Sequence, residues 1–124
     1  MTERVGFDLA RMAYGGHEVV FVYGEIDVLT APRLHEVLHE VIAESPRSLL
    51  VDLANVTFVD SSGLGALVVA HRHLEERGGK LRLVSVPPPV AQVLEVTGLT
   101  NRFEVYADVD AAPGDARPGP PAEG

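Results

Sequence analysis

A short apolar strand pattern that runs directly into a polar helix start is the feature that most constrains this fold. Residues 49–59 form the strand and its exit loop, and a long apolar helical pattern follows at once. A helix start carries free backbone N–H groups and a partial positive charge, so it tolerates an anion. The connecting segment places two serines at the mouth of the helix and reads Val59-Asp60-Ser61-Ser62-Gly63-Leu64-Gly65-Ala66.

The rest of the chain alternates strand and helix patterns. Apolar alternation near the N-terminus, a Gly15-Gly16 turn and a second apolar run predict a hairpin. Thr30 is the expected N-cap of the first helix, with Pro32 in its first turn. The order β-β-α-β-α-β-α-β predicts a single α/β domain with a mixed sheet, in which helices pack on a hairpin joined to parallel strands. The expected strands lie at residues 5–9, 19–23, 48–53, 81–86 and 103–106, and the helices begin at residues 30, 60 and 90.

Length and charge set further limits. The 124 residues suit one domain, expected at residues 1–110, whereas the Ala, Pro and Gly of residues 111–124 predict a disordered tail. With 10 basic and 18 acidic residues the net charge is −8, which argues against a nucleic acid or an anionic membrane as partner. The chain has no cysteine, which excludes disulfides and thiolate sites. No apolar run approaches the roughly 18 residues of a membrane span, and the N-terminus has no signal-peptide character, so we expect a cytoplasmic protein.

Several stretches of the chain carry a family resemblance. The central one is residues 51–53 followed by residues 59–65, between a buried strand and a helix. Gly24-Glu25-Ile26-Asp27 closes the second hairpin strand, and residues 94–103 include Gly98-Leu99 near the C-terminal end. Together these stretches resemble the STAS domain family, and most of all its free-standing anti-sigma factor antagonists. The resemblance covers residues 5–106 and leaves out the tail.

The resemblance implies a partner switch, with no enzyme activity and no cofactor. An unmodified antagonist binds an anti-sigma factor that is also a serine kinase, and a sigma factor is released. The kinase then phosphorylates the first serine of the pair, which is Ser61 here, with Ser62 as second choice. The complex separates until a phosphatase resets it. The alternative keeps the fold without the kinase, as a non-phosphorylated scaffold or an accessory subunit, for example of a lipid-transport or signalling complex.

The expected partner-binding surface surrounds the serine pair. Glycine inside a helix costs roughly 1 kcal/mol relative to alanine, so Gly63 and Gly65 indicate either a partner's close approach or tight packing on the sheet. Leu64 also belongs to the apolar stripe that predicts burial. A phosphate on Ser61 is partly compensated by the helix start and repelled by the neighbouring aspartate. The expected contact residues are Glu25, Asp27, Asp60, Ser61, Ser62, Gly63, Leu64 and Gly65.

Four patterns are weaker candidates for chemistry. The segment from His35 to His39 matches the H-E-x-x-H pattern of zinc proteases. Both histidines fall outside the core-facing stripe and no third ligand is evident, so we expect a solvated polar face and no metal. The serine pair lacks the G-x-S-x-G setting of a hydrolase nucleophile. Gly63-Leu64-Gly65 is neither a dinucleotide-binding nor a P-loop fingerprint, and His71 and His73 point to different helix faces.

Overall fold

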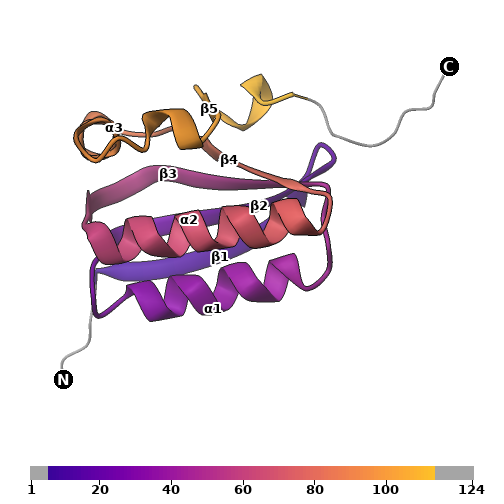
Figure 1. Cartoon of the computed structure of the whole chain (residues 1–124), viewed down its shortest axis with the longest axis horizontal. Helices are drawn as coiled ribbons and strands as arrows, with labels where there is room; N and C mark the ends of the chain where they lie inside the picture. Colours follow the sequence, from indigo (N-terminus) through magenta and orange to yellow (C-terminus); the bar gives the residue numbers. More distant parts are fainter. Residues whose placement is uncertain (1–5, 114–124) are drawn as a thin grey trace, which may run out of the picture.

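The computed structural model describes residues 6–113 and shows a five-stranded sheet with helices packed against it (Figure 1). The strand order is β1-β2-β3-β4-β5. β1 and β2 form an antiparallel hairpin, and the other neighbouring strands pair in parallel, which confirms the predicted mixed sheet. The elements are β1 Phe7–Tyr14, β2 His17–Ile26, α1 Ala31–Ile42, β3 Ser48–Val59, α2 Ser61–Glu76, β4 Lys80–Val84, α3 Pro88–Val96, η1 Thr100–Arg102, β5 Val105–Tyr106 and η2 Val109–Ala111.

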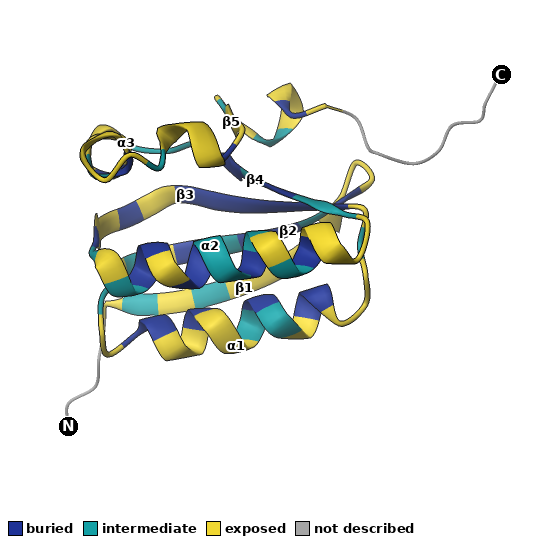
Figure 2. Cartoon of the chain, viewed as in Figure 1, coloured by how far each residue is buried: buried dark blue, intermediate teal, exposed yellow. Residues whose placement is uncertain are grey.

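Helices α1 and α2 lie side by side across one face of the sheet (Figure 1). Their apolar stripes meet alternate residues of the strands, and Leu38, Leu67 and Val51 are each at most 1% exposed in the core between them. Figure 2 shows exposed residues along the outward sides of both helices. This burial holds α2 on the sheet and so fixes where the helix starts relative to the strand ends.

Strand β3 runs to Val59, well beyond residue 53, where the apolar run ends. Its second half stays paired with β2 through two register shifts, the first between the pairs Phe21–Asp52 and Tyr23–Asn55. At this shift the carboxylate of Asp52 accepts a hydrogen bond from the backbone N–H of Ala54 at 2.9 Å. Asp52 therefore stabilises an irregularity of the strand, and the longer strand brings Val59 beside the end of β2.

The opposite face of the sheet carries a second, smaller apolar cluster. Val19, Leu50 and Val84 point away from α1 and α2, because successive residues of a strand face opposite sides, and Ala112 packs against them. Ala112 is 7% exposed and Ala111 ends η2. These two residues belong to the expected tail, and a small apolar side chain can be buried even in a stretch of low-complexity composition. The domain boundary at residue 110 stays a prediction. Residues 114–124 of the expected tail lie outside the described residues.

Candidate functional site

The start of α2 is capped by an aspartate and attached to the end of β2. Asp60 is the N-cap, and its carboxylate accepts hydrogen bonds from the backbone N–H groups of Ser62 at 2.8 Å and Gly63 at 3.2 Å. The N–H of Asp60 donates to the carbonyl oxygen of Ile26 at 3.1 Å. The cap satisfies donors that have no partner inside the helix and places negative charge at the positive end of the helix dipole.

This cap changes the electrostatics expected for the helix start. The sequence indicated N–H groups available to an added anion, whereas the Asp60 carboxylate already accepts from two of them. Ser61 is the first residue of α2 and is exposed, while Ser62 is partly buried. A phosphate on Ser61 would therefore lie beside a resident carboxylate and gain less compensation from the helix than the sequence indicated.

The two glycines of α2 have different surroundings. A methyl group on Gly63 would lie 2.5 Å from Cγ2 of Ile26 and 2.8 Å from Cγ2 of Val59, distances too short for carbon atoms. Glycine at this position therefore lets the helix pack on the strand ends. A methyl group on Gly65 would meet nothing within 4 Å, and the residue is exposed. Packing inside the described chain gives no reason for glycine there, so close approach by a partner stays a prediction for Gly65.

The expected contact residues thus divide into exposed and buried ones. Leu64 is 3% exposed and belongs to the core, as its place in the apolar stripe predicts. The Leu64 side chain and Gly63 are both buried, so neither is available to a partner in this structure. Ser61 and Gly65 are exposed on the helix, and Glu25 is exposed on β2.

Asp27 and Thr30 build the turn between β2 and α1. The carboxylate of Asp27 accepts hydrogen bonds from the N–H groups of Leu29 at 2.9 Å and Thr30 at 3.1 Å. The Thr30 hydroxyl donates to the carbonyl oxygen of Glu25 at 2.7 Å and accepts from the N–H of Asp27 at 2.9 Å. Thr30 does occupy the N-cap position of α1, but its side chain bonds to the turn rather than to the helix. Asp27 therefore has a structural role in addition to any contact with a partner.

Three exposed apolar side chains at this end of the sheet were not indicated by the sequence patterns. Val28 and Leu29 are 67% and 73% exposed, and Phe58 of β3 is 48% exposed. The loop that holds Val28 and Leu29 follows Ile26, whose carbonyl oxygen accepts a hydrogen bond from the N–H of Asp60. Phe58 is the register partner of Glu25. An apolar pair inside a loop, outside any helical stripe, is the signal that could have identified Val28 and Leu29. Ile26 and its register partner Val59 face the core under the helices, so Phe58 faces the other side of the sheet. The exposed loop residues Val28 and Leu29 are of the kind common at docking surfaces.

The described part of the chain offers neither a metal-binding cluster nor a membrane-spanning helix. Among residues 6–113, no group of three or more histidine or acidic side chains is placed to hold a metal ion. None of the helices in that range has the length and apolar character needed to cross a membrane. The expected solvated face is wrong for His39, because its ring contacts His73 where α2 lies against α1, with centroids 4.9 Å apart.

Known proteins share both the sequence pattern and the fold. The family model of the STAS domain matches residues 11–112. Two curated anti-sigma-B factor antagonists are similar: that of Listeria monocytogenes is 36% identical over 89 residues (72% of this chain, 78% of the relative), and that of Staphylococcus aureus is 36% identical over 86 residues (69% and 80%). The crystal structure of an anti-sigma factor antagonist from Mycobacterium paratuberculosis matches with a TM-score of 0.78 and 32% identity, over 89% of this chain and 93% of that one. The chain belongs to the STAS domain family.

Proposed function

We propose that this chain is an anti-sigma factor antagonist, a cytoplasmic regulatory protein and not an enzyme. The names of its curated relatives and of the Mycobacterium structure support this function. In the unmodified form the chain binds an anti-sigma factor with serine kinase activity, and a sigma factor is thereby released. The observation that carries the proposal is the exposed Ser61 at the capped start of α2, which a hydrogen bond from Asp60 ties to the end of β2 and its exposed apolar loop.

The proposed binding surface has an apolar part and an acidic part. Val28 and Leu29 supply exposed apolar area from which water is released when a partner docks. Glu25 and Asp60 lie at the same end of the sheet, and the chain carries a net charge of −8, so a basic rim on the partner would be complementary. On α2, the absence of a side chain at Gly65 lets the partner approach the helix backbone closely.

Phosphorylation of Ser61 acts on this surface through charge. The phosphate adds about −1.5 to −2 charges at neutral pH. Because Asp60 already accepts from the first N–H groups of α2, the new dianion finds fewer donors there and a like charge beside it. A partner closed over this spot would have to remove water from the dianion, which costs several kcal/mol without a cationic partner. The phosphorylated chain therefore separates from the kinase while keeping its fold.

The switch can be tested with substitutions at the serine pair. We expect a cognate anti-sigma factor kinase and ATP to add one phosphate at Ser61, located by mass spectrometry. Ser61→Ala should stay bound to the kinase after ATP is added. Ser61→Asp should bind on the order of tenfold more weakly, which corresponds to about 1.4 kcal/mol. Ser62→Ala is the matched control, and it should still be phosphorylated and released.

Two outcomes would contradict the proposal. If Ser61→Ala and Ser61→Asp both bound the kinase as the unmodified chain does, Ser61 would not be the switch. If the kinase neither bound the chain nor modified it, the non-phosphorylated scaffold or accessory subunit would be the better function. A phosphatase that removes the phosphate from Ser61 and restores kinase binding completes the proposed cycle.

A further inference from the structure

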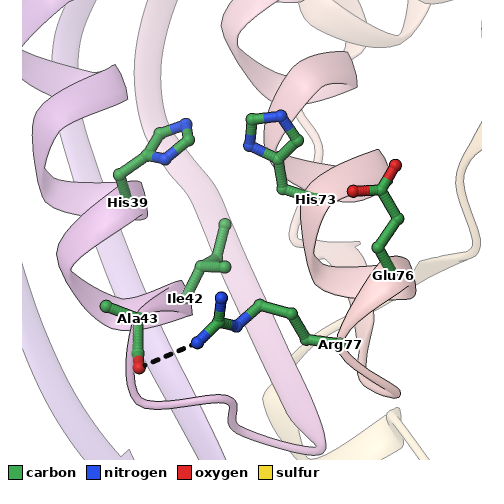
Figure 3. A pocket seen from close by; sticks show the side chains of 6 residues that line it. All are labelled: His39, Ile42, Ala43, His73, Glu76 and Arg77. Atoms are coloured by element: carbon green, nitrogen blue, oxygen red, sulfur yellow. Dashed lines mark hydrogen bonds between the residues drawn. The ribbon is translucent and has the colours of Figure 1, made fainter.

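Helices α1 and α2 contact each other through a row of three imidazole rings. His35 and His39 lie one turn apart on α1, with ring centroids 4.1 Å apart. His39 meets His73 of α2 edge to face, with centroids 4.9 Å apart. Figure 3 shows His39 and His73 pointing toward each other across the space between the two helices. We call these three residues the histidine seam.

The ring of His39 has little compensation for a positive charge. Its Nε2 atom is buried and has no hydrogen-bond partner among residues 6–113. The pKa of His39 is lowered from its ordinary value of 6.5, first because burial disfavours the charged ring and then because of repulsion by His35 and His73. Within the part of the chain that the structure describes, no carboxylate is among the groups that shift this pKa. A proton on His39 is therefore disfavoured by every neighbour that acts on it.

Charged residues flank the seam on both helices. A pocket of about 320 Å³ beside His39 and His73 is lined by Glu76 and Arg77 (Figure 3), and Arg77 donates to the Ala43 carbonyl oxygen and the Ser45 hydroxyl. The strand residues in the core beneath both helices are apolar. The charged residues on the two helices and at their ends are Arg33, Glu36, Glu40 and Glu44 for α1, and Asp60, Arg72, Glu75, Glu76 and Arg77 for α2.

We propose that the histidine seam makes the contact between α1 and α2 sensitive to acid, so that the helices loosen from each other when its rings take up protons. Neutral imidazoles can stack at these separations, whereas protonated rings at the same separations repel one another. A charged His39 would also need a hydrogen-bond partner such as water at its Nε2 atom, which is buried. The proposal concerns the helix pair and does not depend on the proposed switch at Ser61.

The direction of the pH effect follows from proton binding. Because the pKa of His39 in the folded chain is below 6.5, the unfolded chain binds more protons than the folded chain at acid pH. The stability given by the neutral ring is complete above pH 6.5 and is lost as the pH falls through the lowered pKa. Glu104 titrates in a different range, because a hydrogen bond from Arg82 lowers its pKa from 4.5 to about 2.

Urea unfolding of the whole chain between about pH 7.5 and about pH 5 tests the proposal. In wild type, the unfolding equilibrium constant should rise as the pH falls, by up to about tenfold per pH unit for each extra proton bound on unfolding. Replacing the ring with a neutral amide in His39→Gln should remove up to about one of these protons. His73→Gln should also reduce the pH dependence, and the double variant should change it by less than the sum of the two.

His71 provides the matched control. The pKa of His71 is also lowered by burial, but its ring contacts Phe103 and not the seam. His71→Gln should therefore combine additively with His39→Gln. In NMR titrations of the folded chain, the pKa of His39 should rise in His73→Gln, because one repelling neighbour is gone. Additive effects of His39→Gln and His73→Gln, or an unchanged His39 titration in His73→Gln, would overturn the proposal.

Discussion

Gly63 and Gly65 are two residues apart in α2 and should respond in opposite directions to the same substitution. Gly63→Ala forces a methyl group against Ile26 and Val59, and such overpacking costs about 1–3 kcal/mol of stability. Gly65→Ala adds a methyl group in open space and should stabilise the chain by up to about 1 kcal/mol, since alanine favours a helix. Urea unfolding of both variants measures the difference, and destabilisation by Gly65→Ala would show that the glycine is needed inside the fold.

Partner binding separates the two glycines further. If the anti-sigma factor lies close to the helix backbone, Gly65→Ala should weaken binding although it strengthens the fold. A purely structural glycine would not show this combination. Equal affinity for the Gly65→Ala variant and the wild type would remove Gly65 from the proposed binding surface and leave the other exposed groups in place.

At the scale of elements, the β2–α1 loop offers the sharpest test of the binding surface. Leu29 is 73% exposed, so Leu29→Ser should change stability by less than about 0.5 kcal/mol. It should weaken binding of the anti-sigma factor on the order of tenfold, because apolar area is lost from the interface. Met12→Ser is the control: Met12 is 51% exposed and pairs with Val19, which packs on the opposite face of the sheet. Equal binding losses in both variants would argue against a surface centred on Ser61.

The order of the elements could be predicted because each depends on local periodicity and on cap and turn residues. The length of β3 could not, because its second half is interrupted by polar residues and stays in the sheet only through register shifts against β2. For the site, the sequence predicted that Ser61 lies at a helix start. It did not show that the carboxylate of Asp60 accepts from the free N–H groups, which depends on a side-chain conformation. The contact of His39 with His73 depends on where two helices cross, which the periodicity of either one leaves open.

At the scale of the whole molecule, the C-terminal end of the described chain closes the second face of the sheet. A chain that ends after Asp110 should be less stable than one that ends after Pro113, because it lacks the packing of Ala112 in the second apolar cluster. Loss of this packing and of the hydrogen bond from the Ala112 N–H to Val109 should cost on the order of 1 kcal/mol. Thermal unfolding should then show a Tm lower by roughly 4 °C or more. Equal Tm values would support the domain boundary at residue 110 that the composition predicts.

Because the Asp60 carboxylate already accepts hydrogen bonds from two N–H groups at the start of α2, those groups are not free to bind a phosphate on Ser61. The phosphate on Ser61 would remain hydrated at the protein surface and would not bind these backbone N–H groups. A hydrolase could then remove it without waiting for any segment to open. The time for which the chain stays inactive after each phosphorylation would then depend on the amount of that hydrolase, and not on a conformational change of the protein itself.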